Sequence, residues 1–258
     1  MPQNSNNSQL IQSVSRAVDI LRCFAGGKEL RLSEIVSMVG LHKSTVAGIV
    51  NTLKAEGFLE QDSHTNRMQL GLELFTLAVN ARRNLELICE PYLNKLLQLS
   101  GETVNLAVLD VDRSEIVYIA KEESTRSVRI GTSVGKRVPI YCTAIGKVIM
   151  AFMDSQKASA LIDRLDMIPL TERTITDKVL LQAELELILE RGYACDDEEF
   201  EKEVVCIAAP LCNSYGEPLG AISISGPAMR MDSQERLRIA SVLCNEVSKV
   251  SMELSRLR

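Results

Sequence analysis

The chain has 258 residues, of which 46% are hydrophobic and 4% aromatic, with no tryptophan, so we expect one large domain or two smaller ones with aliphatic cores. Its net charge of −5 excludes a generally basic nucleic-acid binder. The charge is uneven, since residues 1–85 carry 9 Lys and Arg against 7 Asp and Glu (net +2), whereas residues 86–258 carry 20 against 27 (net −7). A mildly basic amino end on an acidic body is typical of a small DNA-reading module attached to another domain.

The first twelve residues, MPQNSNNSQLIQ, are polar and lack the charged and then apolar pattern of a secretion signal, so 1–12 are predicted to be a disordered tail. No apolar run approaches the length of a membrane span. The seven cysteines have no regular spacing, and with only two histidines they form no cluster of four zinc ligands. We therefore expect a cytoplasmic protein with reduced thiols, no metal and no cofactor.

Helical periodicity appears three times before residue 58. SVSRAVDILRCFAGG and LSEIVSMVG predict two helices, the second beginning at Ser33 and stopping at Gly40. LHKSTVAGIV opens a third helix that ends at Gly57, and its buried stripe is made of Val46, Ile49, Val50 and Leu53. Residues 58–71 follow as two short extended runs around a polar tip, which predicts a hairpin. Two helices, a tight turn, a third helix and a hairpin are the order of a winged helix-turn-helix.

Residues 72–90 are predicted to continue as a linker helix, and Pro91 fits the first turn of a new helix. The pattern then changes to a mixture of helices and strands that do not strictly alternate, which predicts an α+β domain with an antiparallel sheet. The expected strands are TVNLAVLD, EIVYIAK, SVRI, YACDD, CIAAPL and LGAISIS. The expected helices start at Thr143, cover 155–165 and 177–191, and end with a long helix from Asp232-Ser233.

Several motifs occur in one order: SVSRAVDIL, LSEIVSMVGLHKSTV, VGKRVPIYCTAIGK, GYACDDEEFE, CIAAPL and SISGP. In this order the chain resembles the IclR family of bacterial transcriptional regulators, from about residue 13 to 257. The resemblance implies a winged helix-turn-helix DNA-binding domain (13–71), a linker helix (72–90) and a GAF-like effector-binding and oligomerisation domain (91–258). It also implies a homodimer or homotetramer that binds double-stranded operator DNA of a catabolic operon, most often as a repressor, and responds to a small organic or sugar acid.

The chain departs from the family's pattern at two places. Ala47 and Gly48 follow the KSTV segment, where bulkier polar residues are common, so contacts with DNA at those positions are in doubt. Glu203-Val204 stands before the CIAAPL strand, where a glycine is common, and this can alter a loop beside the effector site.

Recognition helices read base edges with residues near their amino-terminal end. In this chain that end carries Lys43, Ser44 and Thr45, of which the lysine suits a phosphate. Gly48 lies opposite the buried stripe, where a bare surface lets the helix approach the groove closely. Further candidates for DNA contacts are Asn51, Arg16 in the first helix and Arg67 at the wing, each of which can equally be a solvated polar residue.

In AISIS the two serines share one face of a strand and the isoleucines the other, and a serine face needs water or a polar ligand. The helix that starts at Thr143 offers unpaired N–H groups for an anion, and Asp196 can accept from a ligand hydroxyl. Spacing alone favours packing residues with internally satisfied serines. The resemblance carries the family's ligand-contacting positions over to Ile130, Val138, Ala144, Ile145, Asp196, Cys206, Ser223 and Ser225.

Two other functions stay open on the sequence. The first is a cysteine-dependent small-molecule enzyme that uses Cys142 or Cys206, although both histidines lie in the amino-terminal module and no G-x-S-x-G or phosphate-binding loop occurs. The second is a ligand-binding module without DNA affinity. We expect a regulator and no enzyme.

Overall fold

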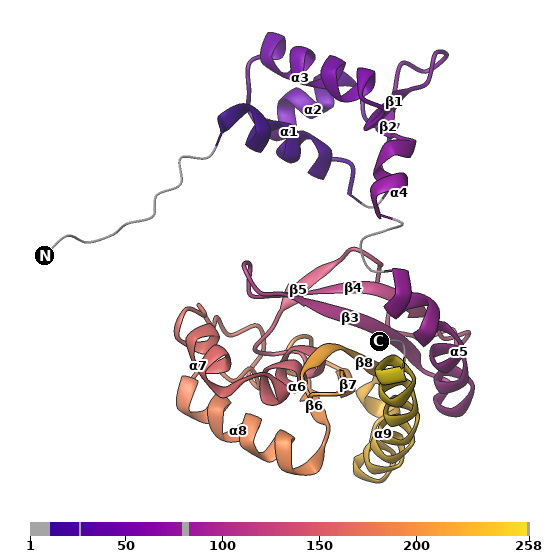
Figure 1. Cartoon of the computed structure of the whole chain (residues 1–258), viewed down its shortest axis with the longest axis vertical. Coiled ribbons are helices and arrows are strands. Elements are labelled where there is room, and N and C mark those ends of the chain that lie inside the picture. Colours follow the sequence, from indigo (N-terminus) through magenta and orange to yellow (C-terminus); the bar gives the residue numbers. More distant parts are fainter. Residues whose placement is uncertain (1–10, 26, 79–82, 257–258) are drawn as a thin grey trace, which may run out of the picture. The chain divides into compact units, whose positions relative to one another are not determined.

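The computed structural model describes residues 11–25, 27–78 and 83–256, and the chain forms two compact units that divide between Arg83 and Asn84. Most of the predicted tail lies outside the described residues. The first unit contains, in chain order, α1 (Gln12–Arg22), α2 (Leu32–Val39), α3 (Lys43–Ala55), β1 (Leu59–Gln61), β2 (Met68–Leu70) and α4 (Leu72–Ala78) (Figure 1).

The core of the first unit is made by the stripe predicted for α3. Val46, Val50 and Leu53 are buried and pack with Ile20 of α1 and Ile35 of α2, together with Phe24, Leu59 and Met68. β1 and β2 pair antiparallel, and Leu30 adds a bridge to Met68 through two backbone hydrogen bonds of 2.9 and 2.8 Å. The winged helix-turn-helix arrangement is therefore confirmed.

The caps of α2 differ in part from the prediction. α2 begins at Leu32 rather than with Ser33 as its cap, because the N–H of Arg31 donates to the carboxylate of Glu34 at 2.6 Å and fixes the first turn one residue earlier. Gly40 ends the helix as predicted, since it takes the left-handed conformation (φ 65°) that a side chain would oppose.

The second unit contains all of α5 (Arg83–Ser100) except its first residue, and one six-stranded sheet. The strands lie in the order β5-β4-β3-β8-β7-β6, and every neighbouring pair is antiparallel. Their bounds are β3 (Thr103–Asp110), β4 (Glu115–Glu122), β5 (Arg137–Pro139), β6 (Ala194–Asp197), β7 (Val204–Cys212) and β8 (Pro218–Pro227). The remaining helices are α6 (Ala144–Phe152), α7 (Ser155–Asp163), α8 (Lys178–Arg191) and α9 (Ser233–Arg256), with a 3-10 turn at Ala228–Arg230 before α9. The predicted α+β class with an antiparallel sheet is confirmed.

Helices cover the two faces of this sheet differently (Figure 1). On one face, α5 and α9 pack against large aliphatic side chains such as Leu106, Ile207, Ile222 and Ile224. On the other face, α6, α7 and α8 form a core to which the central strands contribute small residues: Ala107, Ala208 and Ala221. The central strands thus present small side chains to α6 and large aliphatic side chains to α5 and α9.

Two sequence predictions for the second unit are wrong. Pro91 lies inside α5 rather than at the start of a helix, because Cys89, Leu93 and Leu96 continue one buried stripe past it while the proline itself is exposed. SVRI (127–130) forms no strand, and its Val128 is exposed. The edge strand is instead β5, which pairs Val138 with Ile116 of β4.

Among the described residues, no helix combines the length and the apolar composition that crossing a membrane requires.

Candidate functional site

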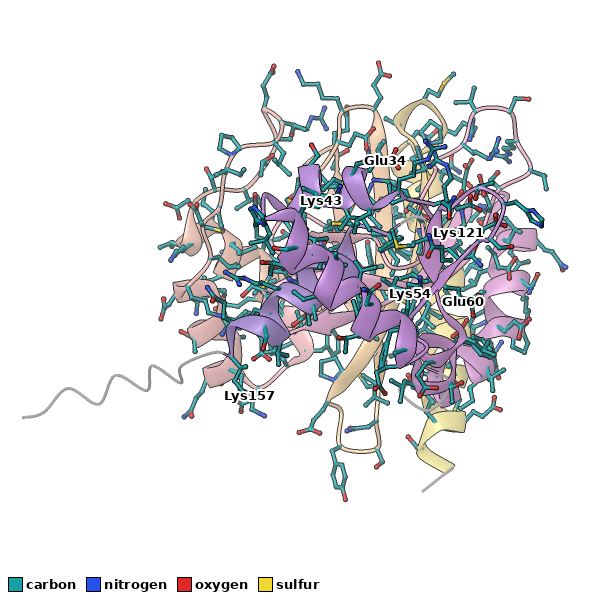
Figure 2. All side chains as sticks on the ribbon, turned by 90° about the horizontal axis from the view of Figure 1, so that it is seen from above. Glu34, Lys43, Lys54, Glu60, Lys121 and Lys157 are labelled. Atoms are coloured by element: carbon teal, nitrogen blue, oxygen red, sulfur yellow. The ribbon has the colours of Figure 1, made fainter. Side chains whose placement is uncertain are left out.

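The amino-terminal end of α3 is capped by His42. Its Nδ1 accepts from the N–H of Ser44 at 3.4 Å and lies 2.8 Å from the Ser44 hydroxyl, which is therefore partly engaged in the cap. Figure 2 labels Lys43, which is exposed in the first turn, and Lys54 in the last turn. Lys54 donates to Gln61 of the wing at 2.5 Å. Sequence reasoning missed the cap because histidine is rare among N-cap residues.

The outward face of α3 is bare at its centre. Gly48 is exposed, and a Cβ added there would meet nothing within 4 Å. Asn51 is exposed and Thr45 half-buried, while Thr52 is tied to the helix through a hydrogen bond from its hydroxyl to the Gly48 carbonyl (3.1 Å). Lys43, Ser44, Gly48 and Asn51 are thus all at the surface of one helix.

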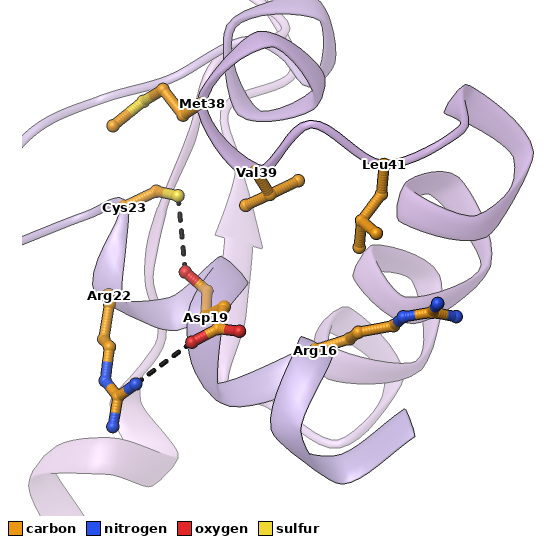
Figure 3. A pocket seen from close by; sticks show the side chains of 7 residues that line it. All are labelled: Arg16, Asp19, Arg22, Cys23, Met38, Val39 and Leu41. Atoms are coloured by element: carbon orange, nitrogen blue, oxygen red, sulfur yellow. Dashed lines mark hydrogen bonds and ion pairs between the residues drawn. The ribbon is translucent and has the colours of Figure 1, made fainter. Parts of the chain in front are cut away.

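The two arginines predicted to touch DNA have different surroundings. Arg67 donates to the carbonyl of Glu29 at 2.7 Å and lies 3.6 Å from the Glu34 carboxylate, so it holds the base of the wing. Arg16 lines an open hollow of about 400 Å³ between α1 and the α2–α3 turn, with Asp19, Arg22, Cys23, Met38, Val39 and Leu41 (Figure 3). Arg22 is paired with Asp19 at 3.0 Å, whereas Figure 3 shows Arg16 extending on the Leu41 side.

Strand register brings the polar side chains of the second unit together. Ser223 and Ser225 of β8 lie opposite Asn105 and Thr103 of β3, and on the other side opposite Ala208 and Cys206 of β7. Asp196 of β6 is in turn opposite Cys206. Because Ile222 and Ile224 belong to the α5–α9 core, the serines face α6, as the alternation predicted.

Both serines receive hydrogen bonds from one buried amide. Asn105 Nδ2 lies 3.5 Å from the Ser223 hydroxyl and 3.4 Å from the Ser225 hydroxyl. Asn105 Oδ1 accepts from the Thr132 hydroxyl at 2.5 Å. Asn105, Ser223 and Ser225 are all at most 2% exposed.

The first turn of α6 lies over this face of the sheet. Thr143 caps it by accepting from the N–H of Gly146 at 3.2 Å, so one of the amides expected to hold an anion is already engaged. The N–H groups of Ala144 and Ile145 have no hydrogen-bond acceptor among the described residues. Gly146 allows the close approach, because a Cβ there would lie 2.0 Å from the Ile140 carbonyl oxygen.

A buried group of charges lies beside the polar strip. Asp196 accepts the N–H groups of Glu199 (2.7 Å) and Phe200 (3.3 Å), and burial together with the nearby Glu199 raises its pKa to about 7. Lys147 of α6 forms an ion pair with Glu199 and donates to the Cys195 carbonyl at 2.6 Å. Glu199 Oε2 is buried without a hydrogen-bond partner among the described residues. The buried ammonium of Lys147 is therefore paired with Glu199, while Asp196 is held by backbone N–H groups.

The apolar residues predicted to contact the effector lie in two separate places. Val138, Ala144 and Ile145 are buried together in the core on the α6 face. Ile130 is half-buried in the segment between β4 and β5, and its carbonyl accepts from the Thr103 hydroxyl at 3.0 Å.

Sequence reasoning missed four polar residues that complete this region: Asn105, Thr132, Lys147 and Glu199. Lys147 could have been noticed, because it is the single charge in the apolar helix AIGKVIMAF. The contact of Asn105 with Thr132 bridges 27 positions and leaves no local signal.

The cysteines lack the properties of a nucleophile. Burial raises the pKa of the Cys142 thiol to about 12 and that of Cys206 well above its ordinary range, which disfavours the reactive thiolate. Within residues 11–25, 27–78 and 83–256, no group of three or more His, Cys, Asp and Glu side chains is placed to hold a metal ion.

Family models match both units: the IclR helix-turn-helix domain over residues 13–63 and the bacterial transcriptional regulator IclR C-terminal domain over residues 77–252. The HTH-type transcriptional regulator KdgR of Escherichia coli is 32% identical over 246 residues, covering 95% of this chain and 93% of KdgR. The transcriptional repressor IclR of E. coli is 29% identical over 251 residues, covering 96% and 92%.

The crystal structure of the Thermotoga maritima IclR superposes with a TM-score of 0.77 at 28% identity, covering 95% of this chain and all of that one. The winged helix-turn-helix, the curled sheet with helices on both faces and these matches over both units agree, and the chain belongs to the IclR family of bacterial transcriptional regulators.

Proposed function

We propose that this DNA-binding regulator represses a catabolic operon and is controlled by a small organic or sugar acid that binds between α6 and the sheet. One observation carries the proposal: strand register gathers Asn105, Ser223, Ser225 and Asp196 on the sheet face that α6 covers and to which β3, β7 and β8 contribute small residues. We further propose the domain limits 13–71, 72–90 and 91–258, with the predicted linker containing α4 and the first part of α5.

The exposed end of α3 is the proposed reading surface. Lys43 neutralises a phosphate, and Ser44, Thr45 and Asn51 offer hydrogen bonds to phosphates or base edges. Gly48 lets the helix backbone approach the groove, because nothing occupies the space beside it. Arg16 contacts the DNA backbone, whereas Arg67 contributes mainly through the wing, since its guanidinium is bound to Glu29 and Glu34.

The effector site supports a small acid rather than a polyanion. Its donors are neutral hydroxyls, one amide and the free N–H groups of Ala144 and Ile145. The nearby ammonium of Lys147 is paired with Glu199, so a carboxylate is held by hydrogen bonds rather than by a free cation. Val138 and Ile145 supply an apolar wall, as does Ile130 from the segment after β4.

Assembly as a homodimer or homotetramer is supported by apolar side chains at the surface of the first unit. Val14 of α1 is 58% exposed, and Leu72, Phe75 and Leu77 of α4 are 68%, 66% and 54% exposed. Apolar side chains in such numbers on short helices are a feature of interaction surfaces. Repression is supported by the E. coli relative that is named a repressor, and the cytoplasm is the proposed location.

The proposal is tested by a thermal-shift screen of sugar acids, keto acids and aromatic acids, because a ligand that binds the native state raises the melting temperature. The acid with the largest effect is then tested on the Ser223→Ala, Ser225→Ala double variant, with Ser251→Ala on α9 as a matched control. We expect the shift to disappear in the double variant and to persist in the control. A full shift in the double variant would refute the site.

A further inference from the structure

Asn105 occupies a position between the proposed effector site and a segment outside the sheet. It is fully buried at the centre of β3, opposite Ser223 on one side and Lys121 on the other. Its amide has two ends with different partners: Oδ1 accepts from Thr132, and Nδ2 faces the two serines.

The contacts at the two ends differ in quality. The bond from Thr132 is 2.5 Å, whereas the contacts of Nδ2 with the serine hydroxyls are 3.4 and 3.5 Å, at the outer limit for such a hydrogen bond. Both donors of this buried amide nitrogen have a partner, but the two hydrogen bonds are longer than the usual range of about 2.7–3.2 Å and are therefore weak. A ligand oxygen placed between the serines would offer Nδ2 a closer acceptor than either hydroxyl.

The segment on the other side is fastened to the same strands. Thr132 also accepts, through its carbonyl, from Lys121 Nζ at 2.7 Å, and the Thr103 hydroxyl donates to the Ile130 carbonyl at 3.0 Å. The Ser124 hydroxyl donates to the Gly101 carbonyl at 2.7 Å. Residues 124–132 therefore lie along β3. Among the described residues of this segment, only Thr132 forms a hydrogen bond with the Asn105 amide, through its hydroxyl.

We propose that Asn105 is a binding and relay residue of the effector site, which deepens the function proposed above and rests on it. Asn105 Nδ2 donates to an oxygen of a small carboxylate held by Ser223 and Ser225. When the amide shifts toward that oxygen, its Oδ1 pulls on the Thr132 hydroxyl, and residues 124–132 change their position on β3. Ligand binding is thereby linked to the arrangement of this segment, and the proposed relay includes the effect of that rearrangement on DNA affinity.

Two variants separate the two roles. Asn105→Asp keeps the shape and the acceptor for Thr132 but replaces the amide donor with a carboxyl, and Asn105→Ala, which has no donor in any protonation state, is measured beside it. Thr132→Val removes only the hydroxyl, and Thr132→Ser retains it as a matched control. The probe is the acid among gluconate, pyruvate and benzoate that raises the melting temperature of the unaltered protein most.

We expect Asn105→Asp to weaken binding of that acid about tenfold or more, since a lost hydrogen bond to a charged group has about this effect. Thr132→Val should leave the acid's Kd within about threefold but reduce its effect on DNA affinity, and Thr132→Ser should behave as the unaltered protein. Near-UV circular dichroism of the tyrosines checks that the sheet is intact in each variant. Asn105→Ala should weaken binding of the acid as Asn105→Asp does.

Unchanged acid affinity in a folded Asn105→Asp or Asn105→Ala protein overturns the binding role, and a normal DNA response in Thr132→Val overturns the relay. If the Ser223→Ala, Ser225→Ala variant loses binding while the Asn105 variants keep it, this inference fails and the proposed function stands. If none of the three acids binds, or the serine variant also binds normally, the proposed acid site fails and this inference with it.

Discussion

Replacing Asp196 by Asn should change how the stability of the second unit depends on pH. The carboxyl is 2% exposed, and burial with the neighbouring Glu199 raises its pKa from 3.8 to about 7. The native state therefore holds a proton that the unfolded chain releases near pH 4. Since the native state binds more protons in this window, the free energy of unfolding falls as pH rises from about 4 to about 7.

The size of the effect follows from the two pKa values. Each pH unit between them changes the free energy of unfolding by at most about 1.4 kcal/mol, so the roughly three units amount to about 4 kcal/mol as an upper limit. Water penetration and relaxation around a buried ion reduce this figure, and we expect about 2 kcal/mol between pH 5 and pH 7.5. Asparagine keeps the acceptor for the Glu199 and Phe200 N–H groups but does not titrate.

Urea unfolding followed by tyrosine fluorescence measures this unit alone, because all five tyrosines lie between residues 92 and 215 and the chain has no tryptophan. The free energy of unfolding of the unaltered protein minus that of Asp196→Asn should be larger at pH 5 than at pH 7.5. Asp197→Asn is the matched control: Arg236 lowers the pKa of Asp197, so its contribution is present above about pH 4 and is lost only as pH falls further. An equal difference between the unaltered protein and Asp196→Asn at both pH values would show that the native Asp196 carboxyl does not have a raised pKa.

Three further changes have defined outcomes. Lys43→Ala should reduce the slope of log affinity for DNA against log salt by about 1 in a fluorescence anisotropy titration. Lys54→Ala should leave the slope unchanged, because the Lys54 ammonium is bound to Gln61. Equal slopes in both variants and the unaltered protein would exclude the phosphate contact of Lys43. Gly48→Ala should stabilise the first unit by about 0.8–1.0 kcal/mol in thermal unfolding and still weaken DNA binding, and unchanged affinity would show that the bare surface has no role. Gly146→Ala should destabilise the second unit by about 3 kcal/mol or more in urea unfolding, because its Cβ would lie 2.0 Å from the Ile140 carbonyl oxygen, and normal stability would contradict the packing of α6.

The parts of the fold that a local pattern determines could be predicted from the sequence. The stripe of α3 has a period of about 3.6 and is buried at Val46, Val50 and Leu53, with Ile49 half-buried. The serines of β8 face away from Ile222 and Ile224 because strand side chains alternate. Glycine in the left-handed region stops α2 at Gly40. These features depend on a few neighbouring residues.

The rest depends on contacts that no local pattern contains. The helix α5 runs through Pro91 because a buried stripe on its other side outweighs a lost backbone hydrogen bond. The short strand β5 exists only because β4 offers it an edge. In the site, Lys147 meets Glu199 across 52 positions, and register alone decides that Asn105 lies opposite Ser223.

We propose that an acid bound on the α6 face of the sheet controls DNA binding by α3. This proposal is tested most directly by anisotropy titration of a fluorescent duplex, obtained by selecting bound sequences from random DNA, with and without the acid found in the thermal-shift screen. We predict that the acid changes the Kd for the duplex about fivefold or more in the unaltered protein. The Ser223→Ala, Ser225→Ala protein should bind the duplex equally well and show no response, whereas an equal response in both proteins would contradict the account.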